Sequence, residues 1–176
     1  MTSFILYSKT NSQRLNYIVE FVFSRVLGLP CEITNSKEYF IASKQFKINY
    51  SNEEIQESDL HIIPISLLSE TAIIEQDISI ETWQELPCFF KTSQYEIPFD
   101  IFSASFFLIT RYEEYYPYSP DLYQRYPEKN SLAFQHNFLN MPLVDYWIMA
   151  LKKIILSKMS DISFPEKNMK FIPTYD

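Results

Sequence analysis

Side chains able to do chemistry are most concentrated in residues 111–126, which read RYEEYYPYSPDLYQRY and hold six of the chain's 13 tyrosines. Carboxylates about 5 to 10 Å apart on two sides of a sugar can act as acid and base in glycoside cleavage. Glu113 or Glu114 together with Asp121 could supply such a pair. Glu113 and Glu114 cannot form it with each other, because neighbouring residues of a helix project about 100° apart.

A structural role is the second interpretation of this segment. Arg111 and Glu114 are three residues apart and can pair on a helix, and partly buried arginines need carboxylate partners. With the tyrosine hydroxyls, such pairs would hold the loop Pro117–Pro127 against the helix end. Arg111→Ala would then cost about 3 kcal/mol or more in a semi-buried site.

A binding surface is the third interpretation. Flat amphipathic rings match the apolar face of a pyranose and offer hydroxyls to its edges. The tyrosines that could form this surface are Tyr112, Tyr115, Tyr116, Tyr118 and Tyr123, and the charged ligand-binding candidates are Arg111, Glu113, Glu114, Asp121 and Arg125. We rank the structural clamp first, the binding surface second and catalysis third.

Composition excludes several classes of function. The net charge is −7 and there is no Lys/Arg cluster, so nucleic acid and anionic bilayers are not expected partners. No apolar run approaches the roughly 18 residues of a membrane span, and the start MTSFILYSK lacks a signal peptide's basic region, so we expect a cytoplasmic protein. The single glycine, Gly28, leaves no phosphate-binding loop.

Metal and nucleophile chemistry also find little support in the sequence. His61 lies in an apolar run and is expected to be a core or sheet-edge residue, and His136 lies in a polar loop. Neither has a second ligand at the spacing of a zinc motif, so we expect no metal in this chain. Cys31 and Cys88 are expected to be reduced core thiols.

The pattern of apolar residues predicts an α/β (or α+β) fold with a short mixed sheet. The expected strands are 4–8, 31–34, 46–50, 60–63 and 88–91. A helix capped by Asn11 or Ser12 follows the first strand and ends at Gly28, and two long helices pack on the sheet from the second half. Asp100 caps the first of these, with Arg111–Tyr115 as its last turn, and Pro142 begins the other.

Residues 99–147 carry a resemblance to a known family. The block contains FD, SASFFLITRYEEY, Asp121 with Arg125 and Tyr126, SLAF, FL and P-LVD-W, with weaker matches at KINYS and LP-FF. It resembles a bacterial family in which an N-terminal module precedes a polysaccharide deacetylase domain. The ending FIPTYD, residues 171–176, is similar to the motif that opens the deacetylase barrel.

This resemblance implies a domain organisation and a partner. Residues 1–163 would be an N-terminal accessory domain, and residues 164–176 a linker and first strand of a deacetylase barrel that is not present. Only in a longer chain would Asp176 be catalytic, as the general base that activates metal-bound water. The divalent, zinc-like metal belongs to that missing domain, which would be this module's partner on the same polypeptide, with glycan as a second candidate partner.

Overall fold

The computed structural model describes residues 3–92, 95–166 and 173, and it confirms the predicted α/β class. The elements follow in the order β1 (Phe4–Tyr7), α1 (Gln13–Val19), η1 (Glu20–Leu27), β2 (Cys31–Thr34), α2 (Lys37–Ala42), β3 (Phe46–Asn49), β4 (Leu60–His61), η2 (Ser66–Leu68), β5 (Glu81–Trp83), β6 (Leu86–Cys88), α3 (Ile101–Ile109), η3 (Tyr112–Tyr115), η4 (Glu128–Asn130), α4 (Leu132–Gln135) and α5 (Leu143–Lys158). Here η1 is a π-helix that continues α1, and the other η elements are 3-10 turns.

The main sheet has four parallel strands in the order β2-β1-β3-β4. Because β1 is central, its side chains are buried on both faces: Phe4 and Leu6 join the main core, and Ile5 and Tyr7 pack with Phe40 of α2. The helices α1 and α2 therefore cover opposite faces of the sheet. Antiparallel pairing occurs separately, in the two-stranded sheet β5-β6.

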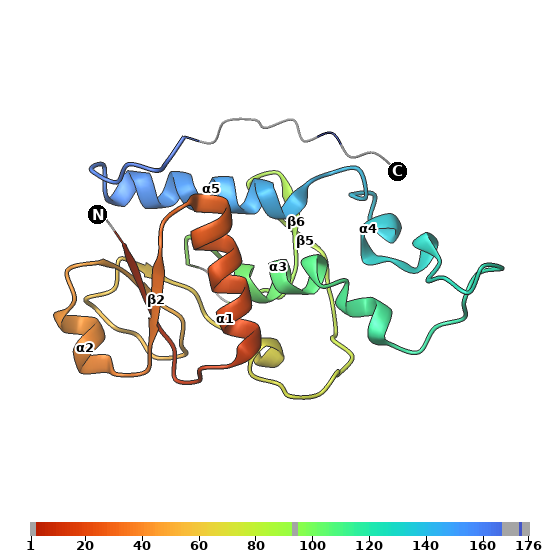
Figure 1. Ribbon diagram of the computed structural model, residues 1–176, viewed down its shortest axis with the longest axis horizontal. Coiled ribbons are helices and arrows are strands. Elements are labelled where there is room, and N and C mark those ends of the chain that lie inside the picture. Colours follow the sequence, from red (N-terminus) through yellow and green to blue (C-terminus); the bar gives the residue numbers. More distant parts are fainter. Residues whose placement is uncertain (1–2, 93–94, 167–172, 174–176) are drawn as a thin grey trace.

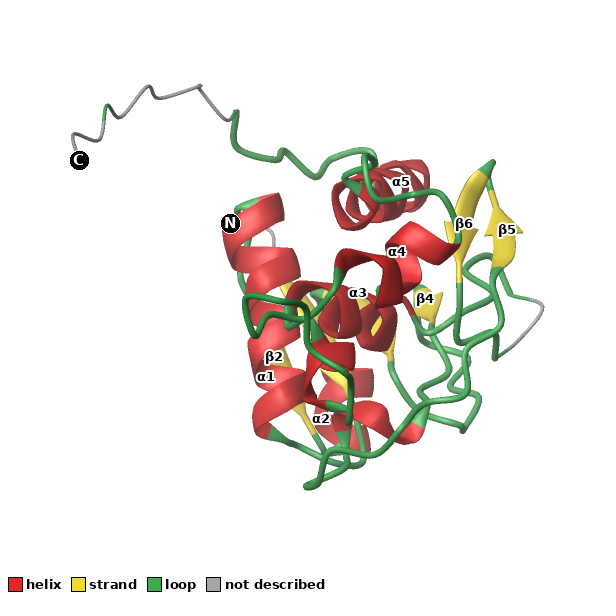
Figure 2. Ribbon diagram, turned by 90° about the vertical axis from the view of Figure 1, so that its right-hand side faces the viewer, coloured by secondary structure: helices red, strands yellow, loops and turns green. Residues whose placement is uncertain are grey.

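The two helices of the second half cover the core as predicted. Every residue of α3 from Ile101 to Phe107 is buried, and its Phe102 ring contacts those of Phe23 and Tyr50. Figure 1 shows α5 lying across the end of η1, which it contacts. The β5-β6 hairpin lies beside α5 (Figure 2), and the buried Trp147 of α5 donates its indole N–H to the Pro87 carbonyl of β6 at 3.0 Å.

The predicted ends of the first helix are confirmed. Ser12 is the N-cap, and its hydroxyl accepts a hydrogen bond from the Leu15 N–H at 3.0 Å. Gly28 follows the helix in the left-handed region at φ 77°, where a glycine has no steric penalty. A Cβ at this position would lie 3.0 Å from Cγ of Pro165, so the chain after α5 packs back over the helix end.

Several predicted boundaries are wrong. Strand β4 pairs over two residues only. The strand predicted at Cys88–Lys91 instead pairs over Leu86–Cys88, because Phe90 has a positive φ of 64° and turns the chain. The strand predicted at 46–50 is half-buried at Lys47, as expected, but Asn49 is fully buried, and its side-chain amide donates to the Glu53 carbonyl at 2.6 Å. Phe164, which lies in the predicted linker, stacks against Phe4 with ring centroids 6.4 Å apart. Asp176 lies outside the described residues.

Candidate functional site

The segment 111–126 does not continue α3 as predicted. The helix ends at Ile109, and the Thr110 hydroxyl donates a hydrogen bond back to the Phe106 carbonyl at 2.7 Å. Arg111 then takes a left-handed conformation at φ 50°, ψ 46°, and the 3-10 turn η3 follows. Because the chain changes direction at Arg111, the segment is divided into residues that point into the protein and residues that point out.

Two tyrosines of the segment point inward and bind the loop 72–76. The Tyr112 side chain is 2% exposed, and its hydroxyl accepts a hydrogen bond from the Ile74 N–H at 3.0 Å. Its ring packs against Phe107 and lies 5.4 Å from the Arg14 guanidinium carbon. The Tyr116 hydroxyl accepts from the Gln76 N–H at 3.0 Å, so the two tyrosines fasten this loop to the end of α3.

Glu113 also points inward. One of its carboxylate oxygens accepts a hydrogen bond from the Leu132 N–H at 2.8 Å, at the first residue of α4. Burial raises the pKa of Glu113 above its ordinary value, and the Leu132 N–H opposes that rise. Glu113 therefore connects η3 to α4, whereas the predicted clamp was to hold the loop Pro117–Pro127 against the helix end.

The arginines of the segment do not form a buried clamp. Arg111 pairs with Glu114, but 70% of the Arg111 side chain is exposed, so the pair is not in the semi-buried site that was predicted, and we expect Arg111→Ala to cost less than about 0.5 kcal/mol. Asp121 pairs with Arg125 at 3.1 Å inside one short turn, and the Arg125 N–H lowers the pKa of Asp121. A lowered pKa does not suit a general acid at neutral pH.

Two tyrosines of the segment point outward, and other residues of the segment line a groove. Tyr115 is 66% exposed and Tyr123 is 76% exposed. The groove, of about 380 Å³, lies between the segment, α4 and the start of α5. Its floor is apolar and its rim carries charged groups; the floor includes Leu108, Ile109, Phe138, Met141 and Val144, and the rim Arg111, Glu113, Glu114, Glu128 and Asp145. Of the two predicted carboxylate pairs, Glu113 and Asp121 do not share this groove, whereas Glu114 and Asp121 both line an adjoining hollow.

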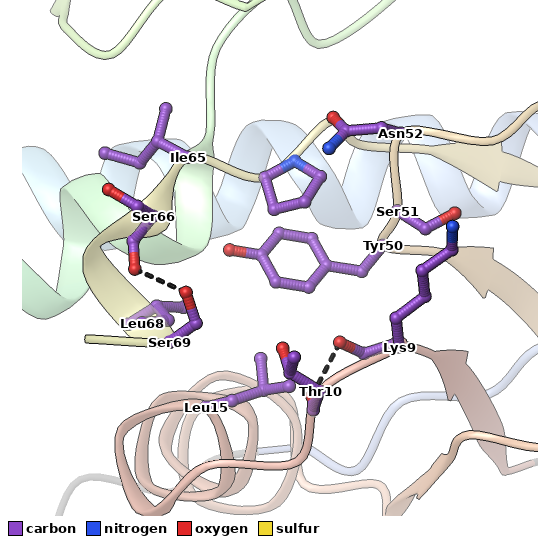
Figure 3. Close-up of a pocket in the computed structure, with 12 residues that line it drawn as sticks. Lys9, Thr10, Leu15, Tyr50, Ser51, Asn52, Ile65, Ser66, Leu68 and Ser69 are labelled. Carbon is purple, nitrogen blue, oxygen red and sulfur yellow. Dashed lines mark hydrogen bonds between the residues drawn. The ribbon is translucent and has the colours of Figure 1, made fainter. Parts of the chain in front are cut away.

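A second cavity was not predicted from the sequence. It has about 330 Å³ and lies at the carboxyl edge of the parallel sheet, and we call it the sheet-edge cavity (Figure 3). Its walls come from the segments that follow three strands: Ser8, Lys9 and Thr10 after β1, Tyr50, Ser51 and Asn52 after β3, and Pro64, Ile65 and Ser66 after β4, with Leu15, Leu68 and Ser69 completing it. Short runs of Ser, Thr and Asn after apolar strands were its only sequence signal.

Behind this cavity Asp100, the predicted cap of α3, is fully buried and joins several elements. Its Oδ2 accepts hydrogen bonds from the Tyr50 hydroxyl at 2.8 Å, the Ile65 N–H at 2.9 Å and the Ser103 hydroxyl at 2.6 Å. Its Oδ1 accepts from the Ser103 N–H at 3.0 Å. One carboxylate therefore fixes the ends of β3 and β4 against the start of α3.

Burial raises the pKa of Asp100, and this predicts a pH dependence. The folded protein holds the Asp100 proton to higher pH than the unfolded chain, so this contribution to stability is complete below about pH 3.9 and is lost as pH rises through the folded pKa. Urea unfolding of wild type and Asp100→Asn from pH 4 to neutrality should give a stability difference that changes with pH. A pH-independent difference would contradict it.

Within the part of the chain that the structure describes, no group of three or more His, Cys, Asp or Glu residues could hold a metal ion. His61 bonds the Ser51 carbonyl through Nε2 at 2.9 Å. None of the helices in these residues is long and apolar enough to cross a bilayer.

Comparison with known proteins gives one match. No curated protein and no solved structure matches the chain. The model of a family of unknown function, DUF7033, matches residues 4–160, which run from the first residue of β1 to just beyond the end of α5. The chain therefore belongs to the DUF7033 family of unknown function.

Proposed function

We propose that this chain is a non-catalytic accessory domain of a metal-dependent polysaccharide deacetylase and that it binds glycan for a following catalytic domain. The observation that carries the glycan-binding part is that the segment 111–126 has both inward-pointing and exposed tyrosines. Tyr112 and Tyr116 are fastened to the protein, while Tyr115 and Tyr123 are 66% and 76% exposed. The link to a deacetylase is supported by the sequence resemblance of residues 99–147.

This arrangement suits recognition of a sugar chain. Binding costs less entropy when the contact residues are already held in place, and a tyrosine has few rotatable bonds to restrict. The Arg125 guanidinium carbon lies 4.8 Å from the centre of the Tyr123 ring, which supports that ring at the surface. The carboxylates on the rim of the neighbouring groove can accept hydrogen bonds from sugar hydroxyls.

The deacetylation chemistry belongs, in this proposal, to the following domain. The resemblance implies that an aspartate and two histidines of that domain hold the divalent metal, and Asp176 would correspond to its general base. The donor set described here does not fit such a site, because no group of three candidate ligands occurs in the described residues. We therefore derive no catalytic step for this chain.

The outer face of α5 offers a surface on which the following domain can pack. Tyr146, Met149 and Leu156 recur at helical spacing and are 45%, 44% and 36% exposed. After α5 the chain turns back along the same helix, where Lys152 Nζ lies 4.7 Å from the centre of the Phe164 ring. The segment that follows α5 thus lies against this helix at Phe164.

Calorimetric titration of the 176-residue chain with an acetylated chitooligosaccharide tests the glycan contact. We expect saturable binding that Tyr115→Ala and Tyr123→Ala each weaken by about tenfold, because stacking of a ring contributes roughly 1 to 1.5 kcal/mol. Tyr39→Ala is the matched control, since Tyr39 is 50% exposed on the distant helix α2.

Two outcomes would oppose this proposal. Equal affinity for all three variants would move the binding surface away from the segment 111–126. A flat titration with several acetylated oligosaccharides would remove the glycan contact, and an independent protein-binding module would then be the better interpretation of the exposed tyrosines.

A further inference from the structure

We infer that the sheet-edge cavity binds a small neutral polyhydroxylated molecule, of the size of one sugar or inositol ring. The topology of the sheet places the cavity where such sites occur. The connection from β1 to β2 leads to one side of β1, and the connection from β2 to β3 crosses to the other side. The carboxyl ends of β1 and β3 therefore lie at a topological switch point, which in open α/β sheets leaves a crevice for ligands.

The walls of the cavity are fixed by buried polar groups. Asp100 holds the Tyr50 hydroxyl and the Ile65 N–H, which belong to two different walls. On the β3 side, the buried Ser51 donates its hydroxyl to the side-chain Oδ1 of Asn49 at 2.7 Å, and the Ser51 backbone carbonyl contacts His61 Nε2 at 2.9 Å. A cavity whose walls are held in this way loses little entropy when a ligand enters.

The lining is amphipathic. Tyr50 reaches from the end of β3 toward Ile65 and Ser66, with Thr10 and Leu15 along its side (Figure 3). The apolar surfaces thus meet a rim of hydroxyl and amide groups, of which Thr10, Asn52, Ser66 and Ser69 are exposed at the mouth. A sugar-sized ring has the same division, with apolar C–H faces and hydroxyls around the edge.

Charge favours a neutral ligand over an anion. Lys9 is the one charged residue in the lining, and its ammonium is already paired with Glu53 at 2.6 Å. The other polar side chains of the lining are neutral: the Ser8, Ser66 and Ser69 hydroxyls already donate to the protein and can accept from a ligand, and the Asn52 amide can donate and accept. A volume of about 330 Å³ is at the lower end of the range for small-molecule sites, which suits one ring and not a chain of several.

An NMR titration of the ¹⁵N-labelled 176-residue chain tests this inference. The separate probes are glucose, myo-inositol and inorganic phosphate. Each is added up to about 10 mM, a concentration that approaches saturation of a site with Kd near 1 mM. We expect saturable shifts of the Lys9, Thr10, Asn52 and Ser66 amides with a neutral probe. Asn52→Leu should raise Kd about fivefold, as expected for the loss of one hydrogen bond. Asn140→Leu makes the same chemical change at an exposed residue outside the cavity and should leave Kd unchanged.

Other results would overturn the inference. Shifts of these amides with phosphate alone would show an anion site, and the absence of saturable shifts with both neutral probes would show no site of this class. An Asn52→Leu variant with unchanged Kd would place the ligand elsewhere. This inference does not rest on the proposed function: shifts confined to residues 111–126 would overturn it and leave the glycan surface standing.

Discussion

Replacing Asp100 by alanine is expected to lower the free energy of unfolding by about 3 to 5 kcal/mol, because several buried hydrogen-bond donors would lose their acceptor at once. The donors are the Tyr50 hydroxyl, the Ile65 N–H and both the hydroxyl and the N–H of Ser103. Asp100 is 0% exposed, so water cannot replace the carboxylate without a rearrangement. Urea unfolding followed by circular dichroism would measure the loss.

The control for this experiment is Asp161→Ala, since Asp161 is exposed near the end of the domain and should change stability by less than about 0.5 kcal/mol. The loss of stability caused by Asp100→Asn should lie between those of Asp100→Ala and Asp161→Ala, because an amide keeps the shape and one acceptor oxygen but adds a donor. A loss below about 1 kcal/mol for Asp100→Ala would contradict the view that this carboxylate joins the strand ends to α3.

Tyr112→Ala is the second substitution with a large expected effect, about 3 to 5 kcal/mol, because it removes a fully enclosed ring from contact with Phe106, Phe107 and Tyr116. Tyr112→Phe should cost only about 1 to 2 kcal/mol, since it leaves the ring in place and deprives the Ile74 N–H of its acceptor. Thermal unfolding of both variants would separate packing from the hydrogen bond.

Arg111→Ala is the matched comparison, one residue away in the sequence. It should cost less than about 0.5 kcal/mol, because the Arg111 side chain is 70% exposed and its pair with Glu114 is largely solvated. If Arg111→Ala were as damaging as Tyr112→Ala, the segment would be held by its ion pairs and the description of an inward tyrosine anchor would be incorrect.

Much of the fold could be predicted because local chemistry and burial agree. The serine cap at Ser12, the left-handed Gly28 and the aspartate cap at Asp100 each lie at the boundary of an apolar periodic run. The helix α5, which follows Pro142, buries most of the apolar stripe that was predicted to face the core, including Trp147, Ile148 and Leu151. In these elements the sequence pattern and the tertiary contacts require the same conformation.

The missed elements have identifiable physical causes. The hairpin β5-β6 turns through Gln84 and Glu85 at φ 50° and 65°, a left-handed pair that usually calls for Asn and Gly, so the sequence carries no turn signal there. The helix α2 has six residues and buries only Phe40 among them, which is too short a pattern for its period to be recognised. Arg111 likewise adopts positive φ without glycine, which hid the change of direction after α3.

The two candidate sites also differ in how far they could be predicted from the sequence. The segment 111–126 was visible because its tyrosines and charges are adjacent in sequence, but which of the residues after α3 point inward depends on the left-handed conformation of Arg111. The sheet-edge cavity combines segments that begin at Ser8, Tyr50 and Pro64, more than forty residues apart at the widest. Only the strand order brings them together, and strand order was not predictable from the apolar pattern.

The most direct test of the proposed accessory role is a titration of the chain with an acetylated chitooligosaccharide in the presence of Zn²⁺. NMR signals of the tyrosine rings report binding, and released acetate is measured in the same sample. We predict saturable shifts of Tyr115 and Tyr123, larger than those of Tyr112, and no release of acetate. Unmoved tyrosine resonances would contradict the glycan surface, and acetate released by this chain alone would contradict its non-catalytic role.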